Sequence, residues 1–97
     1  YQGAIDNYTK AIEIDPYNSS YYCYLGLCRS LLKMDQEAID YYNSAIEIDP
    51  KNANAYYYRG KAKFELKDYQ GACEDWKKAA ELGSEDAAEL LKKHCQN

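Results

Sequence analysis

The residues that could do chemistry stand near the carboxyl end of the chain. His94 is the only histidine, Cys95 follows it directly, and Cys73 lies further upstream. A histidine and two cysteines could ligate zinc, but this spacing matches no known zinc pattern. No Ser or Cys beside His94 comes with an orienting acid, which argues against nucleophilic catalysis. We therefore predict no catalytic residue, no cofactor and no metal site.

Two pairs of acidic residues occur at equivalent places in the chain. Glu13 and Asp15 form the first pair, and Glu47 and Asp49 form the second. Residues two positions apart on a helix do not face one another, so these carboxylates cannot work as an acid–base pair. They are better explained as the chemistry of helix ends. We predict that the chain is not an enzyme.

The cysteines give a hint about the compartment. Cys23, Cys28, Cys73 and Cys95 show neither C-x-x-C spacing nor the density of a disulfide scaffold. We expect Cys73 on a buried face and all four thiols reduced, as in a cytosolic protein. The chain has no start that resembles a signal peptide and no apolar run of about 18 residues. We therefore expect a soluble, cytoplasmic chain with no membrane partner.

The charge balance limits the kind of partner. The 97 residues carry 12 Lys and Arg against 16 Asp and Glu, a formal net charge of −4. No basic stripe is present to release counterions from phosphates, which argues against nucleic acid as a partner. The 12 tyrosines, together with many alanines, suit helices that pack through small residues while aromatic rings fill the gaps.

One six-residue segment occurs twice and indicates how the chain is organised. The sequence Ala-Ile-Glu-Ile-Asp-Pro spans residues 11–16 and returns unchanged at 45–50, 34 positions later. A further step of the same length reaches residues 79–84, which keep the alanine, the glutamate and an apolar residue but lose the proline. A fixed period of this size indicates an array of stacked repeats.

Apolar residues at helical spacing predict six helices. They cover residues 2–14, 20–32, 36–48, 54–66, 69–82 and a segment that begins near Ser84. Asn18 or Ser19 can cap the second helix, Asp35 the third and Asn52 the fourth. Gly26 lies in the middle of a helix and costs it about 1 kcal/mol. We expect a packing reason there, namely the close approach of the partner helix.

The 34-residue unit resembles the tetratricopeptide repeat (TPR), whose pattern is aromatic-x2-Leu-Gly-x2-Tyr, then Ala-x3-Phe, Ala and Pro. Residues 19–52 carry this pattern through Tyr22, Leu25, Gly26, Ala38, Tyr42, Ala45 and Pro50, with Arg29 in place of the second tyrosine. Residues 53–86 carry it through Tyr56, Gly60, Ala72, Trp76 and Ala79. There Arg59 replaces the leucine, Lys63 the tyrosine and Ser84 the proline, which suits a repeat near the end of an array.

The resemblance implies an all-α fold, a right-handed α-α superhelix of helix hairpins. We divide the chain into the second half of a repeat (1–18), two full repeats (19–52 and 53–86) and a capping helix (85–97). The first segment lacks a partner helix, so Ile5, Tyr8 and Ile12 miss a neighbour. We predict that another copy of the chain covers this N-terminal edge in a homo-oligomer.

The resemblance also implies a ligand site, because in TPR proteins the first helix of each hairpin lines a concave groove that usually binds a peptide. The matching residues are Ser20, Cys23, Tyr24, Leu27, Asn54, Tyr57, Tyr58, Lys61 and Phe64. Aromatic rings clustered on a concave face favour partner binding, although the same rings could instead pack against neighbouring helices. We predict a non-catalytic scaffold that binds a peptide or protein segment. The alternative is a structural or self-association segment of a longer repeat protein, with no groove ligand.

One branch of the TPR family holds the acidic tails of heat-shock chaperones with a clamp of lysines, asparagines and an arginine. The matching positions here are Ser20, Tyr24, Asn54 and Tyr58. The two tyrosines replace the expected asparagine and arginine, and no lysine stands at the other two positions. We therefore do not expect a chaperone tail as the ligand.

Overall fold

The computed structural model describes residues 2–95, and this part of the chain contains six helices and no strand. The helices are α1 (Gln2–Ile14), α2 (Ser19–Leu31), α3 (Asp35–Ile48), α4 (Ala53–Glu65), α5 (Tyr69–Glu81) and α6 (Glu85–His94). None of these described helices combines the length and the apolar character needed to cross a bilayer. The predicted ranges agree with the observed ones to within a residue or two, and the all-α fold is confirmed.

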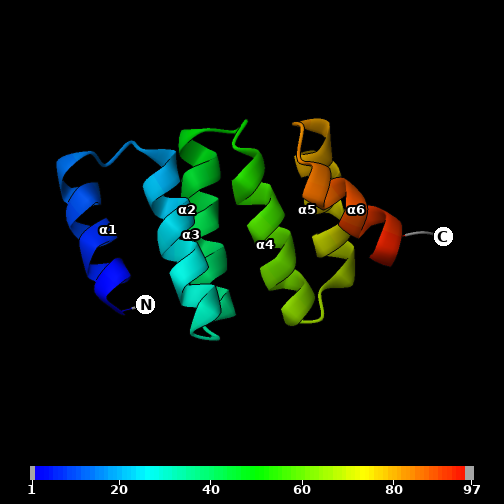
Figure 1. The fold of residues 1–97 in the computed structure, drawn as a ribbon, viewed down its shortest axis with the longest axis horizontal. Coiled ribbons are helices and arrows are strands. Elements are labelled where there is room, and N and C mark those ends of the chain that lie inside the picture. The colour runs from blue at the N-terminus through cyan, green and yellow to red at the C-terminus, as the bar shows by residue number, and fades with distance from the viewer. Residues whose placement is uncertain (1, 96–97) are drawn as a thin grey trace.

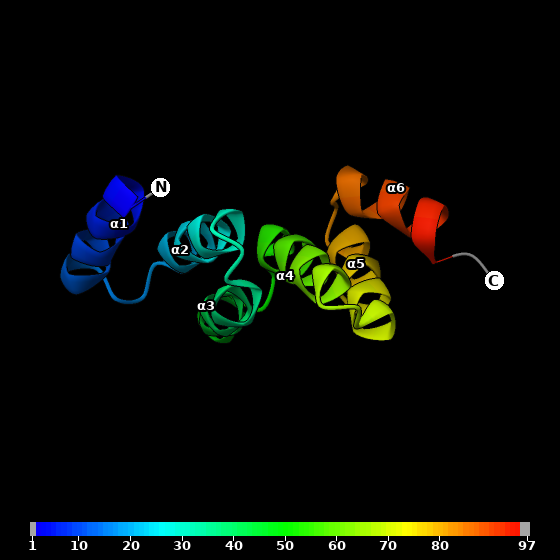
Figure 2. The same cartoon turned by 90° about the horizontal axis from the view of Figure 1, so that it is seen from below.

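The helices stack in chain order along an elongated molecule (Figure 1), with principal extents of 44 × 25 × 17 Å. Helices α2 and α3 form one antiparallel hairpin, and α4 and α5 form the next. Helix α1 packs on α2, α3 packs on α4, and α6 packs on α5. Figure 2 shows α2, α4 and α6 along one side of the stack and α3 and α5 along the other. Each hairpin thus contacts its neighbours in sequence, as expected for a superhelix of repeats.

The helix starts follow the predicted capping residues in two cases and not in a third. Asn18 and Asn52 each accept a hydrogen bond from a backbone N–H of the following first turn, at 3.0 and 3.2 Å. The prediction that Asp35 caps α3 is wrong, because α3 begins at Asp35 itself and Met34 stands at the cap position. The Asp35 carboxylate instead accepts a hydrogen bond from the Ser30 hydroxyl at 3.1 Å. It remains in the first turn, where a negative charge complements the helix dipole.

The two mid-helix glycines allow close contact between the helices of each hairpin. A Cβ atom added to Gly26 would lie 2.5 Å from Cε1 of Tyr42, and one added to Gly60 would lie 2.5 Å from Nε1 of Trp76. Tyr42 and Trp76 are 0% and 1% exposed and are among the largest fully buried side chains. The expected packing reason for Gly26 is confirmed, and it is repeated one period later at Gly60.

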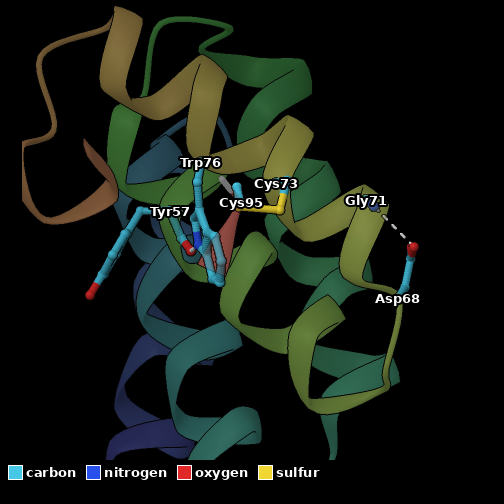
Figure 3. The surroundings of a disulfide bond; sticks show 6 residues. All are labelled: Tyr57, Asp68, Gly71, Cys73, Trp76 and Cys95. Atoms are coloured by element: carbon cyan, nitrogen blue, oxygen red, sulfur yellow. Dashed lines mark hydrogen bonds between the residues drawn. A yellow bond between two sulfur atoms is a disulfide. The ribbon is translucent and has the colours of Figure 1, made fainter. Parts of the chain in front are cut away.

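The cysteine prediction is wrong for two of the four residues. Cys73 and Cys95 form a disulfide, with their Cα atoms 5.9 Å apart (Figure 3). Cys23 and Cys28 are free and buried. Because α6 folds back along α5, two cysteines that are 22 residues apart in sequence come together. The spacing of cysteines along the chain does not reveal such a pairing between helices.

The N-terminal edge is less well covered than the rest of the stack. Ile5 is buried against Leu25 and Cys28, whereas Tyr8 and Ile12 are only partly buried. Within residues 2–95, two of the three residues for which we expected incomplete packing are therefore only partly covered. Association with another copy of the chain stays a prediction.

Candidate functional site

A polar hollow separates the first helices of the two full repeats. It has a volume of about 270 Å³ and is lined by Ser20, Cys23, Tyr24, Asn52, Asn54 and Tyr58. These walls carry hydroxyl and amide groups but no formally charged side chain. Such groups can both donate and accept hydrogen bonds, as the backbone of an extended peptide requires.

A second hollow of about 190 Å³ continues the surface toward the turn between α2 and α3. Its lining consists of Leu27, Ser30, Leu31, Lys33, Asp35, Tyr58, Lys61 and Glu65. Tyr58 lines both hollows, so the two adjoin. Together they form a continuous strip along α2 and α4, which we call the α2/α4 groove. One end of it is neutral and polar, and the other end carries charges of both signs.

The tyrosines of the groove also take part in the packing between repeats. Tyr24 stacks on Tyr8 with ring centroids 5.1 Å apart, and Tyr58 stacks on Tyr42 at 6.2 Å. The second pair is the first one shifted by one repeat. Tyr24 nevertheless remains 46% exposed. Burial is the main cause of a raised pKa at Tyr58 and the neighbouring Tyr57 adds to it, so the Tyr58 phenol is neutral at physiological pH. The packing interpretation of these rings is therefore partly correct, and their part in binding a partner stays a prediction.

Lys61 is the one cation of α4 that the described residues leave without a carboxylate partner. Its Nζ atom lies 5.3 Å from the ring centroid of Tyr57 and 6.0 Å from that of Tyr58. The other two cations of the helix, Arg59 and Lys63, are bound to Asp75. Lys61 is exposed at the charged end of the groove, where it can attract an acidic group of a ligand.

Three of the predicted groove residues lie elsewhere or contribute less than expected. Cys23 is 5% exposed, and its Sγ accepts a hydrogen bond from Asn52 Nδ2 at 3.4 Å, so it forms part of the floor rather than an exposed wall. The Phe64 ring contacts Tyr69, Trp76 and His94, at centroid distances of 4.9, 5.6 and 4.8 Å, and it lines neither hollow. Tyr57 is half-buried and touches the groove only through Tyr58 and Lys61. The remaining six, Ser20, Tyr24, Leu27, Asn54, Tyr58 and Lys61, line the two hollows.

Sequence analysis missed a buried ionic cluster centred on Asp75. Its carboxylate accepts hydrogen bonds from Arg59 Nε at 2.8 Å and Nη2 at 2.7 Å, and Lys63 Nζ lies 3.1 Å away. Arg59 also donates to Asn43 Oδ1 of α3 at 2.9 Å, which ties the two hairpins together. The two basic departures from the repeat pattern thus serve to neutralise one acid. The sequence did contain a sign of this cluster. Residues 53–86 carry two cations that the repeat pattern lacks, together with one acid on the buried face.

The candidate metal ligands do not form a metal site in the part of the chain that the structure describes. Cys73 and Cys95 are bonded to each other. The His94 ring lies 4.8 Å from Phe64 and 6.0 Å from Trp76, between aromatic neighbours. No group of three or more His, Cys, Asp or Glu side chains in residues 2–95 is placed to hold a metal ion.

Three family models for this repeat match the chain, and together they span residues 7–82. A model described as TPR repeat matches residues 35–67. Two models described as tetratricopeptide repeat match residues 7–40 and 54–82. No curated protein sequence matches the chain significantly.

Several solved structures match the fold over most of the chain. The first TPR of Spaghetti (RPAP3), bound to the HSP90 peptide SRMEEVD, is 32% identical with a TM-score of 0.93, over 99% of this chain and 80% of that one. The Arabidopsis OM64 TPR domain is 33% identical with a TM-score of 0.85, over 92% and 75%. The TPR2B domain of yeast Sti1, in its complex with pHsp70, is 27% identical with a TM-score of 0.86, over 95% and 80%.

Stacked helix hairpins with a lined groove define a helical-repeat interaction domain. The repeat pattern, the family models and the similar structures agree on which one. The chain belongs to the tetratricopeptide repeat family, and it is a protein-interaction module.

The similar structures do not bear out our expectation against a chaperone tail as the ligand. A domain that is 32% identical holds an HSP90 peptide, and one that is 27% identical is in complex with pHsp70. The expectation rested on positions 24 and 58, where tyrosines replace an asparagine and an arginine, and on positions 20 and 54, which carry no lysine. The hydroxyl and amide groups at these four positions are nevertheless hydrogen-bond donors, and a carboxylate can accept bonds from neutral donors.

Proposed function

We propose that the α2/α4 groove binds an extended peptide and that the chain acts as a non-catalytic adaptor. The observation that carries this proposal is the pair of adjoining hollows that share Tyr58. A peptide running along the groove would meet hydroxyl and amide groups at one end and Lys61 at the other. The neutral end suits backbone groups, and the charged end suits one acidic side chain or a terminal carboxylate.

The charge of Lys61 indicates which end of the groove should hold an acidic group of the ligand. Lys33 and Lys61 line the second hollow together with Asp35 and Glu65. Asp35 accepts a hydrogen bond from Ser30, whereas Lys61 lies over two tyrosine rings and forms no ion pair within the described part of the chain. An acidic ligand group at Lys61 would gain a charge partner without breaking an existing ion pair. Acidic tails such as the HSP90 peptide held by a similar domain therefore become candidates for the ligand.

The proposal needs no reaction chemistry from the chain. Its site residues are hydroxyl, amide, aromatic and lysine side chains that bind and orient a peptide. We accordingly propose that the chain is not an enzyme. Its cytoplasmic location stays a prediction from the sequence.

Selection from a phage-displayed library of peptides with free carboxyl termini would test the groove. We expect wild-type chain to enrich peptides with an acidic residue or acidic carboxyl end, and calorimetry to measure their affinity alongside that of SRMEEVD. Lys61→Glu should weaken the enriched peptides by about tenfold or more, because it turns an attraction into a repulsion. Tyr24→Ala, at an exposed ring, should weaken them as well. Lys51→Glu makes the same charge change on the exposed turn after α3 and should leave binding unchanged.

Two results would count against the proposal. Equal affinities for wild type and Lys61→Glu would mean that peptides bind outside the groove. A library that yields no peptide, together with no binding of SRMEEVD, would favour the alternative of a structural or self-association segment. Circular dichroism of every variant is needed, because a loss of helix would also abolish binding.

A further inference from the structure

The last helix is attached to the rest of the stack mainly through one neighbour, and its His94 ring also contacts Phe64 of α4. Helix α6 packs on α5, where Ala87 is fully buried and Leu90, Leu91 and Cys95 pack against a cluster that contains Trp76. A helix of 10 residues is marginal by itself in water, because helix nucleation is costly and few hydrogen bonds repay it. Whatever holds α6 on α5 therefore decides whether this helix is formed.

The disulfide is placed where it controls that attachment. The chain passes from α5 into α6 through a turn at Gly83, so one end of α6 is already tied to α5. Cys95 lies just past the other end of α6, and Cys73 lies near the start of α5. The bond therefore closes the open end of the α5–α6 pair. Figure 3 shows it beside Trp76.

The Cys73–Cys95 bond is accessible from solvent, whereas the free cysteines Cys23 and Cys28 are buried. Cys73 and Cys95 line an open hollow of about 550 Å³ together with Tyr69, Gln70, Glu74, Lys77, Leu91 and His94. Both are half-buried, whereas Cys23 and Cys28 are 5% and 7% exposed. A small thiol can enter such a hollow, and thiol–disulfide exchange requires access of the attacking sulfur to the bond.

We propose that the Cys73–Cys95 pair is a thiol–disulfide exchange site that latches α6 onto α5. The thiolate of a small thiol such as glutathione attacks one sulfur, forms a mixed disulfide and releases the other cysteine as a thiolate. A second glutathione attacks the mixed disulfide, so two protein thiols and one oxidised glutathione result. The two electrons come from the two glutathione molecules, and the released thiolates take protons from water. Oxidised glutathione closes the latch by the reverse steps.

Opening the latch has a defined structural consequence. Without the bond, α6 is held by its narrow apolar edge, its turn and the ring contact between His94 and Phe64, so it undocks more often. Undocking uncovers Trp76, which is 1% exposed when α6 is in place. The Trp76 indole donates to the backbone oxygen of Tyr57 at 3.2 Å, so the change begins next to the charged end of the groove.

Trp76 also supplies the measurement, because it is the only tryptophan in the chain. We expect the chain incubated with oxidised glutathione to contain two free thiols, and the chain incubated with excess reduced glutathione to contain four. Reduction should shift tryptophan emission to the red and increase its quenching by acrylamide. It should also lower Tm by on the order of 10 °C, since a cross-link of this loop length restricts the unfolded chain. Hydrogen exchange should increase in α6 before the other helices.

The Cys73→Ser/Cys95→Ser variant is the matched control. It should resemble the reduced wild type in emission and Tm, and reductant should not change it. The proposal is overturned if the chain keeps four free thiols under oxidised glutathione, since the bond then does not form in solution. It is also overturned if oxidised and reduced wild type have the same Tm and the same exchange in α6. These comparisons use the unmodified chain, so they hold even if the double variant folds poorly.

Discussion

At the scale of single residues, Asp75 marks the main difference between the two full repeats. Position 75 corresponds to Tyr41 one period earlier, and Arg59 corresponds to Leu25. Leu25 and Tyr41 pack in an apolar cluster, whereas Asp75 and Arg59 form a bidentate ion pair. The Asp75 side chain is 6% exposed and that of Arg59 is 19% exposed. The two charges must therefore neutralise each other, because water cannot do so.

We predict that Asp75→Ala lowers the free energy of unfolding by about 3 kcal/mol, as expected for a buried charge that loses its partner. The loss arises mainly because Arg59 and Lys63 stay partly buried without their carboxylate. Urea denaturation of the wild type and the variant measures it. Glu74→Ala removes the neighbouring exposed acid and should change stability by no more than about 0.5 kcal/mol.

The double variant Arg59→Leu/Asp75→Tyr gives a sharper test of the same cluster. It installs the residues found one repeat earlier, so the charges of Arg59 and Asp75 leave together and an apolar contact replaces them. Lys63 keeps its charge beside the new tyrosine, as Arg29 does 5.7 Å from the centroid of the Tyr41 ring one repeat earlier. We expect a stability within about 1 kcal/mol of wild type, or higher. A double variant as unstable as Asp75→Ala would show that the site needs its charges for another reason.

The raised pKa of the buried Cys23 thiol leads us to predict a loss of folding stability at alkaline pH. Burial raises the pKa of its thiol from 9.0 to about 11, although the hydrogen bond from Asn52 opposes the shift. The folded-state pKa is the higher one, so the stabilisation is complete below pH 9 and is lost as the pH rises to about 11. We predict that the stability difference between wild type and Cys23→Ala falls by about 2 kcal/mol between pH 8 and 11. A difference that stays constant with pH would contradict it.

At the scale of helices, the glycines decide how closely each hairpin packs. A Cβ atom at Gly60 would meet Trp76 Nε1 at 2.5 Å and the Ala72 carbonyl oxygen at 3.1 Å, whereas one at Gly3 would meet nothing within 4 Å. We predict that Gly60→Ala destabilises the chain by about 1 to 3 kcal/mol, because overpacking outweighs the gain in helix propensity. Gly3→Ala should be neutral or stabilise by up to about 1 kcal/mol. Thermal melts of the two variants should move in opposite directions.

The turn inside each hairpin holds a lysine in a left-handed conformation. Lys33 and Lys67 have φ angles of 65° and 68°. A non-glycine residue costs roughly 1 kcal/mol there, whereas glycine adopts the conformation freely but gains more entropy on unfolding. We predict that Lys67→Gly stabilises the chain by about 0.5 kcal/mol and that Lys67→Ala gains nothing. Equal melting temperatures for these two variants would contradict this explanation.

At the scale of the whole molecule, stability should fall toward the ends of the stack. Helix α1 packs mainly on α2, whereas α2 contacts α1, α3 and α4. Ala4 and Ala11 of α1 are partly buried, while their counterparts one repeat later, Ala38 and Ala45, are fully buried. Each repeat is therefore stabilised by its neighbours rather than by one common core.

This arrangement predicts an order of hydrogen exchange under native conditions. We expect amides of α3 and α4 to exchange slowest and those of α1 to exchange at least about tenfold faster, because end helices open locally. Under oxidising conditions α6 should lie in between. Uniform protection across all six helices would mean that the stack opens only as a unit.

Much of this architecture follows from local rules. The period of 34 residues, the apolar spacing and the capping residues Asn18 and Asn52 determined the number, ends and order of the helices. Gly26 in the middle of a helix indicated a close helix contact, which the structure shows at Tyr42. These features are readable because each depends on residues within one helix or one turn, where the physics of the backbone and of helical periodicity applies directly.

The sequence by itself determined the repeat, the hairpins and the face that forms the groove, because those depend on periodicity. Only the tertiary structure decided which side chains that face keeps exposed. Cys23 lies in the floor, Phe64 points toward α6, and Lys61 is the one α4 cation without a carboxylate partner among residues 2–95. The tertiary structure also decided that Cys73 meets Cys95 and that Asp75 is buried between cations. Such contacts depend on where one helix lies against the next, and a shift of one residue in that packing would change every partner.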